Sequence, residues 1–420
     1  MNQSKFLACI FFTFILADVN AQVMSLTQVL EKIERDNPML AGYKTRAEAL
    51  NNYAEGARAW MAPMAGIGTF MTPYPSLSGK NKSAMADGDE SDRGSLMISV
   101  EQTIPNKNKL DANRKYLGEK SKTEELKRNQ QWNELRFQAR QAYYTWSVAE
   151  EKLKELEQTA GIVKMMAETT VSRLAYNQST PTAVYRAQAR VAEIENMKLM
   201  TESLIQESKA ALTTLMNLSD GAAFGIEPVS LQSVNLIIPD TAALAQKRSD
   251  ILGIDREIEL MKLNRKLQSL QNKPDVRLRF DHMQSYGDMP DQFTAMAMFT
   301  IPVAPWSSKM YKSEIAGMTG EIQSMRQERS ALLIETRGMI NRMVFQIRNM
   351  KAQLGRYESG IIPSLQRNYE SLNIAWEENR ETLPMVLDGL EALTMARLEY
   401  LEKKQSLYLM IAAYEKFIEE

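Results

Sequence analysis

The strongest pattern in the chain is a heptad-like spacing of apolar and small residues in its first half. The intervals alternate between three and four at Trp132, Leu135, Ala139, Ala142, Trp146, Ala149, Leu153, Leu156, Ala160, Val163 and Ala167. This spacing is typical of a helix that packs along partner helices. The pattern breaks at Arg173 and returns from Ala183 to about Leu218. We therefore predict a long helical hairpin whose tip spans residues 173–182.

Four strands are predicted, the first because the residues after Pro63 are extended in character and the other three because apolar residues occupy every second position. They span about residues 63–74, 95–104, 275–286 and 292–302. In the third strand, Val276, Leu278 and Phe280 form one apolar face, and charged residues alternate with them. Such a strand suits lipid or a protein core on one side and water on the other.

Shorter helical stretches precede each pair of strands. The first is expected from Leu26 to about Met61, with an interruption near Asn37, and the second from Leu244 to Asn272. In the second half of the chain, Pro363 is expected to kink the long helix, because proline cannot donate the helical hydrogen bond.

The chain therefore has the same order of elements twice: helix, strand, strand, long helix, tip and return helix. The first repeat is predicted over residues 22–218 and the second over 241–420, joined by a linker at 219–240. The helical hairpins are predicted at about 107–218 and 306–418. The second tip is expected at 376–388. Repeats of this length indicate an internal duplication with pseudo-symmetry and not a solenoid.

The dimensions of these elements favour an assembly of several chains. A helix of about 70 residues is roughly 100 Å long at 1.5 Å per residue, which exceeds a compact globular domain. Four strands cannot close a barrel, and an open edge cannot lie in lipid. Strands shared between chains would instead form a wide barrel with a polar lumen. The alternative is a soluble, secreted coiled-coil scaffold whose strands form a small capping sheet.

Composition excludes several classes of function. The formal net charge is −1, and basic residues are interspersed with acidic ones, so nucleic acid is not expected as a partner. The only cysteine is Cys9 and the only histidine is His282. Disulfide frameworks, Cys/His metal clusters and histidine-based catalysis are thereby ruled out. We expect neither an enzyme nor a bound cofactor.

The first residues have the features of a secretory signal peptide. Lys5 precedes an apolar run over residues 6–17, and Val19-Asn20-Ala21 fits the small-x-small rule for cleavage. We predict a signal peptide over residues 1–21 that is cleaved after Ala21. Cys9 lies within the apolar run without lipoprotein spacing after it, so lipidation is not expected.

Motifs at the two tips carry a family resemblance. The first tip reads Arg173-Leu174-Ala175-Tyr176-Asn177, and the second reads Trp376-Glu377-Glu378-Asn379 followed by Val386-Leu387-Asp388-Gly389-Leu390. At the first tip, Asn177 stands where the family has glycine, and asparagine tolerates left-handed backbone better than most residues. At the second tip, Asn379 takes the place of the family's glycine. Further matches are Asn37-Pro38-Met39-Leu40, Arg248-Ser249-Asp250-Ile251, two Thr-Ile-Pro strand ends and residues 212–218. In their order and doubling, these motifs resemble the TolC-type outer membrane efflux protein family over essentially the whole mature chain.

The resemblance implies a mainly α-helical chain that forms a homotrimer. Its strands would build a shared twelve-stranded transmembrane β-barrel in the outer membrane lipid of a Gram-negative bacterium. Its helices would build a long coiled-coil tunnel through the periplasm, with the linker at the equator. The chain would be the passive exit duct of a tripartite efflux system, together with a periplasmic adaptor (membrane fusion protein) and an inner-membrane pump of the resistance-nodulation-division or ABC type. Type I protein secretion is the alternative within this fold.

The resemblance also assigns roles to residues at the tips. Asp388, Met385 and Trp376 would form the periplasmic gate, and Arg173, Leu174, Asn177 and Asn379 would support the tips and adaptor docking. The family often has a second aspartate at the position of Met385, so a double carboxylate ring is not expected. Each of these residues also has an ordinary interpretation as a solvated charge or a helix-packing side chain.

The 27 methionines raise the question of copper or silver efflux, because thioethers are soft ligands. Met339, Met343 and Met350 have the spacing of a packed seam, where methionine fills core space. The methionines that could face a lumen are Met64, Met97, Met296, Met298 and Met385. Heavy-metal efflux and drug efflux both remain open from the sequence.

Overall fold

The structure is a computed structural model that describes residues 22–72, 94–176, 178–219, 221–229, 236–285 and 290–419. The expected signal peptide, residues 1–21, and the tip residue Asn177 lie outside the described residues.

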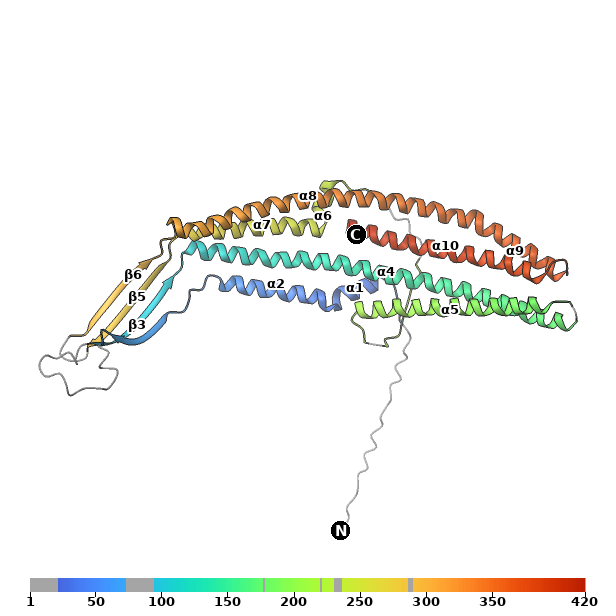
Figure 1. Ribbon diagram of the computed structural model, residues 1–420, viewed down its shortest axis with the longest axis horizontal. Coiled ribbons are helices and arrows are strands. Elements are labelled where there is room, and N and C mark those ends of the chain that lie inside the picture. Colours follow the sequence, from blue (N-terminus) through green and yellow to red (C-terminus); the bar gives the residue numbers. More distant parts are fainter. Residues whose placement is uncertain are drawn as a thin grey trace, which may run out of the picture. The chain divides into compact units, whose positions relative to one another are not determined.

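Helices make up most of the described chain, in the duplicated order that the sequence predicts (Figure 1). The first repeat contains α1 (Leu26–Asp36), α2 (Pro38–Gly56), α4 (Lys107–Ala175) and α5 (Pro181–Leu215). The second contains α6 (Thr241–Lys247), α7 (Ser249–Ser269) with a 3-10 turn at Leu270–Asn272, α8 (Pro305–Arg356), α9 (Ile362–Glu377) and α10 (Leu383–Ile418). The predicted fold class, a mainly helical chain with a duplicated order of elements, is confirmed.

The duplication extends to the backbone of the short helices. Asn37 separates α1 from α2 with φ −74° and ψ 122°, and Arg248 separates α6 from α7 with φ −72° and ψ 123°. The break at Asn37 was expected, because Pro38 disfavours helical backbone in the residue before it. The continuous helix predicted over residues 244–272 is wrong at Arg248, where no proline marks the break. The first stretch also ends at Gly56, short of the predicted Met61.

The long helix of the second repeat changes its hydrogen bonding before Pro363. Residues Tyr357–Ile361 form a π-helical turn, and the amide of Ile362 donates to the carbonyl of Tyr357. Pro363 then lies in the first turn of α9, where its missing N–H costs no helical hydrogen bond. The predicted disturbance is therefore a single wide turn between two α-helical segments.

Four strands form one antiparallel sheet in the order β2 (Met64–Phe70), β3 (Ser95–Ile104), β5 (Val276–Ser285) and β6 (Gln292–Phe299). Each repeat supplies one hairpin, and the two hairpins join where β3 pairs with β5. A second, two-stranded sheet pairs β1 (Gln22–Met24) in parallel with β4 (Phe224–Ile226), and the sequence pattern did not predict it.

The described chain divides into two compact units, and each unit takes segments from both repeats. One comprises Met1–Pro38, Glu134–Ile237 and Arg342–Lys416 and contains both helical tips. The other comprises Met39–Asn133, Ile238–Asn341 and Phe417–Glu420 and contains the four-stranded sheet. The long helices α4 and α8 contribute to both units.

In the first unit, the hydroxyl of Tyr143 ties the small sheet to α4. The hydroxyl lies 3.0 Å from the carbonyl oxygen of Met24 and 2.9 Å from that of Glu227, at the ends of β1 and β4. The side chain is 2% exposed, and burial raises the pKa of Tyr143 to about 12. This buried hydroxyl therefore connects residues that are more than 80 positions apart.

We predict that Tyr143→Phe destabilises this unit by about 1 kcal/mol, because the carbonyl groups of Met24 and Glu227 lose the buried hydroxyl as a hydrogen-bond donor. Thermal unfolding of the purified protein measures the effect. Tyr185→Phe is the matched control, since Tyr185 is 69% exposed on α5. Equal melting temperatures for the two variants would contradict a structural role for the Tyr143 hydroxyl.

Candidate gate at the helical tips

The first tip is a short connection with defined caps at its second helix. After α4 ends, the amide of Gln178 donates to the carbonyl of Arg173 at 2.9 Å. The hydroxyl of Thr180 then accepts from the amide of Ala183 and caps α5. Pro181 occupies the first turn of α5, where its fixed φ favours helix initiation.

The second tip turns through a left-handed residue. Asn379 has φ 59°, and the amide of the next residue, Arg380, donates to the carbonyl of Ala375 at 2.7 Å. This backbone arrangement is one that glycine or asparagine adopts at the end of a helix. The asparagine that stands where the family has glycine thus serves the same conformational purpose.

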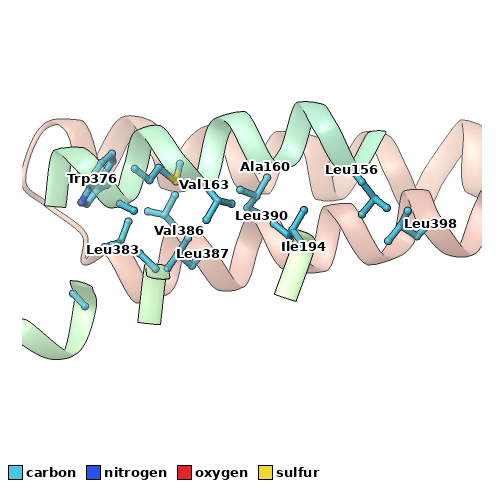
Figure 2. Close-up of a cluster of buried hydrophobic side chains, with 14 residues drawn as sticks. Leu156, Ala160, Val163, Ile194, Trp376, Leu383, Val386, Leu387, Leu390 and Leu398 are labelled. Atoms are coloured by element: carbon cyan, nitrogen blue, oxygen red, sulfur yellow. The ribbon is translucent and has the colours of Figure 1, made fainter. Parts of the chain in front are cut away.

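Behind the tips, α4, α5, α9 and α10 share one apolar core (Figure 2). Its members are Leu156, Ala160, Val163, Met166, Ala167, Ala183, Ala187, Ile194, Trp376, Leu383, Val386, Leu387, Leu390 and Leu398. Burial of each large side chain contributes about 1.5–3 kcal/mol. Tyr369 packs against this core, and burial raises its pKa. The core fixes the two hairpins to one another within this unit.

Arg173 joins the end of the first hairpin to the end of the second. Its guanidinium carbon lies 4.4 Å from the centre of the Trp376 ring, and its Nη1 donates to the carbonyl of Trp376 at 3.2 Å. Trp376 is 8% exposed and lies at the tip end of the core in Figure 2. The contact combines a cation–π interaction with a bond to a carbonyl near the C-terminus of α9.

Two ion pairs connect α5 with α10 beside this contact. Arg186 pairs with Asp388, and both side chains are about half exposed, at 49% and 51%. One turn further along α5, Arg190 lies 3.4 Å from Glu391 and 2.9 Å from Glu193. An exposed pair such as that of Arg186 and Asp388 contributes about 0.2–1 kcal/mol. This pair holds the hairpins together weakly, in contrast to the apolar core.

The other residues predicted from the sequence lie near these contacts. Met385 is 49% exposed and precedes Asp388 by three positions, so both side chains lie on one face of α10. Leu174 is half-buried and Asn379 is exposed. The structure therefore brings Arg173 and Trp376 together and leaves Met385 and Asp388 at a surface.

The sequence patterns did not predict that arginines of α5 pair with the carboxylates of α10. Arg186 and Arg190 are four positions apart, and Asp388 and Glu391 are three apart, which gives two matching charged faces. This spacing is a usable signal. It identifies partners only once the two hairpins are known to pack side by side.

The tips offer ionic and apolar contacts and no recognisable metal centre. Within the ranges that the structure describes, His, Cys, Asp and Glu form no group of three that could hold a metal ion. Among the described helices, none combines the length and the apolar character needed to cross a membrane.

We predict that Asn379→Gly leaves the second tip unchanged, whereas Asn379→Val weakens it by about 1–2 kcal/mol, because a β-branched residue disfavours positive φ. Hydrogen exchange of the tip amides measures this local stability. Ser371→Val, at an exposed position within α9, is the control for the loss of a polar group. Unchanged exchange in Asn379→Val would show that the left-handed conformation does not stabilise the tip.

The comparisons with known proteins show a family match in the first repeat and a shared fold along most of the chain. The outer membrane efflux protein family matches residues 29–218. VceC, an outer membrane protein from Vibrio cholerae, is 16% identical with a TM-score of 0.72, and the match covers 94% of this chain and 95% of that chain. The CmeC outer membrane channel of Campylobacter jejuni is 12% identical with a TM-score of 0.75, covering 94% and 85%. The open state of the Neisseria gonorrhoeae MtrE outer membrane channel is 12% identical with a TM-score of 0.70, covering 94% and 88%.

No curated protein matches the sequence. Identities this low show the fold alone, whereas the family match rests on the sequence of the first repeat. The first repeat thus matches the outer membrane efflux protein family over residues 29–218, and the chain shares its fold along almost its whole length with solved outer membrane channels.

Proposed function

We propose that the chain is the outer membrane channel of a tripartite efflux system, a homotrimeric passive duct. The observation that carries this proposal is the exposure of the sheet. On its apolar face, Ile98, Val100 and Phe280 are 46%, 46% and 48% exposed. On its polar face, Ser95 and Asp281 are only 6% and 3% exposed. A sheet in water usually covers such a row of apolar side chains, so the exposed apolar face suits lipid.

Across the junction of the hairpins, the register places most of the large apolar side chains on one face and the charged side chains on the other. Val100 lies opposite Phe280 on the apolar face, and Ser99 lies opposite Asp281 on the polar face. The charges of the polar face are paired, with Arg279 to Asp281 at 2.9 Å and Arg277 to Glu101 at 3.1 Å. This face suits a water-filled lumen.

The outer strands favour assembly with further copies. Within the described sheet, β2 and β6 each pair on one side only. Unpaired backbone groups are costly in lipid, so β2 of one copy would pair with β6 of the next. Two copies would give eight strands, too narrow for an open lumen, and three would give twelve. The trimer that the family resemblance implies thus also fits the need for a duct.

The lumen face is rich in methionine. All five methionines of the four strands lie on the polar face: Met64, Met97, Met283, Met296 and Met298. Met97 lies directly opposite Met283. Thioethers bind soft cations such as copper(I) and silver(I), and they also adapt to varied apolar solutes. Heavy metals and apolar drugs are therefore the two substrate classes that this face favours, and a susceptibility profile separates them.

The tips would close the periplasmic end of the duct, with Asp388, Met385 and Trp376 at the constriction. Support comes from the exposed positions of Met385 and Asp388 on α10 and from the contact between Arg173 and Trp376. A periplasmic adaptor docking at Arg173, Leu174, Asn177 and Asn379 would open the tips. The inner-membrane pump would be of the resistance-nodulation-division or ABC type, and a protein substrate would indicate type I secretion.

We predict that the purified mature chain forms trimers that insert into planar bilayers and conduct ions. A strain that lacks the gene should become sensitive either to silver and copper or to apolar drugs. A neutral change such as Lys198→Gln should restore resistance on complementation as the wild type does. A monomer recovered only in the soluble periplasmic fraction would contradict the channel and support the soluble scaffold.

We further predict that Arg186→Gln strengthens block of the channel by divalent cations, because the Asp388 carboxylate loses its paired charge. Arg186→Gln combined with Asp388→Asn should abolish the added block. Single-channel conductance at increasing calcium concentration measures both effects, and we expect a change in blocking concentration of about tenfold, or roughly 1.4 kcal/mol. Lys198→Gln removes one charge from the same helix as a control. If calcium blocks all of these channels equally, Asp388 is not at the constriction.

A further inference from the structure

The end of the sheet where strands meet helices carries a pocket of about 520 Å³. Its walls come from the segment before β2, the β3–α4 junction and the start of β5, all within the second compact unit. The lining residues are Arg58, Trp60, Ile104, Pro105, Asn106, Lys107, Leu110, Asp111, Pro274 and Val276. We call it the junction pocket. Its apolar lining residues are called the floor, and its charged lining residues, Arg58, Lys107 and Asp111, are called the rim.

The charged rim contains an oriented arginine. Arg58 faces Asp111 through two nitrogens, with Nε at 2.7 Å and Nη2 at 2.6 Å from the same carboxylate oxygen. A guanidinium has five N–H donors, so its other terminal nitrogen remains available to a ligand. Lys107 is exposed and adds a second cation. Two cations and one carboxylate leave one net positive charge on the rim.

The apolar floor continues onto the exposed face of the sheet. Ile104 pairs with Val276, and the next apolar residue of β5, Leu278, lines a groove of about 490 Å³ together with Val100 and Phe280. From Val276 to Phe280 this path is about 14 Å long at 3.4 Å per residue. A linear apolar chain can therefore lie along the sheet while a charged group stays at the rim.

Tryptophans mark the same end of the sheet as a boundary between lipid and water. Trp60 before β2 is 56% exposed, and Trp306 after β6 is 84% exposed. Exposed Lys273 and Lys309 lie at the same strand–helix junctions. Tryptophan and basic residues concentrate at membrane interfaces, where amphipathic rings and cations meet headgroups.

We propose that the junction pocket binds one anionic glycerophospholipid of the surrounding membrane. The phosphodiester bears one negative charge, which complements the net charge of the rim, and it accepts hydrogen bonds from Arg58 and Lys107. An acyl chain follows the apolar path from Ile104 and Val276 toward Phe280. Asp111 is a positioning residue that holds the guanidinium toward the phosphate. The site depends on the proposed membrane location of the sheet and adds a specific lipid to it.

The test is retention of dioleoyl phosphatidylglycerol by the purified mature protein in detergent, counted per chain by native mass spectrometry. We expect one retained lipid per chain, with binding weakened about tenfold in Lys107→Gln or Arg58→Gln, as for the loss of one charge-assisted hydrogen bond. Lys120→Gln removes an exposed charge further along α4 and should bind as the wild type does. Phosphatidylethanolamine, which carries no net charge, should be retained less.

Three outcomes would overturn the site. The first is that Lys107→Gln and Arg58→Gln retain as much lipid as the wild type. The second is that Lys120→Gln loses as much lipid as these two variants. The third is that sn-glycerol 3-phosphate, which has no acyl chain, displaces the bound lipid. A second measurement uses phosphatidylglycerol with brominated acyl chains, which should quench the wild type more than Trp60→Phe. Conducting channels without selective retention would overturn only the lipid site. Retention without conductance would overturn the efflux duct.

Discussion

Backbone hydrogen bonding at the edges of the four-stranded sheet is the constraint on which the other features depend. An apolar face exposed to 45% or more at Leu278, Ile98 and Phe280 suits lipid, but lipid offers no partner to unpaired N–H and C=O groups. In the proposed assembly, pairing with further copies would satisfy the edges of β2 and β6 and would place the paired charges of the other face around a lumen. A polar lumen lining, a boundary between lipid and water near the junction pocket and a periplasmic end that can close are all features that such a shared barrel would need.

The helical tips combine strong and weak contacts in a way that suits reversible opening. The apolar core around Val163, Ile194 and Val386 is fully buried and keeps the hairpins together. The pair of Arg186 and Asp388 is half exposed and contributes little. The cation–π contact between Arg173 and Trp376 is intermediate and lies at the outermost end of the core. A partner that competes for these outer contacts can therefore change the tips without unfolding the core.

Periodic patterns predicted most of the fold. Breaks between helices were predicted only where a distinctive residue marks them in the sequence. Heptad spacing identified the long helices, and alternation identified β3, β5 and β6, whereas β2 was predicted from the extended character of the residues after Pro63. The helix break at Asn37 was predicted because proline follows it, whereas the equivalent break at Arg248 has no such residue. Strands of three residues, β1 and β4, are too short for periodicity to show. At the tips, Asn379 was matched to a glycine of the family, but its left-handed backbone was not predicted. The partners of Arg173 and Asp388 depend on packing between segments about 200 residues apart.

Each of the two compact units is built from segments of both repeats, so neither unit can be complete before late parts of the chain are available. Each unit includes residues beyond 237 as well as residues before 134, so neither repeat contains the core of either unit. The first unit lacks part of its core until residues 342–416 are available. Chains dominated by such distant contacts fold slowly, because loop closure precedes the stabilising contacts. A partly synthesised chain therefore keeps its apolar seams exposed until nearly the whole sequence is available.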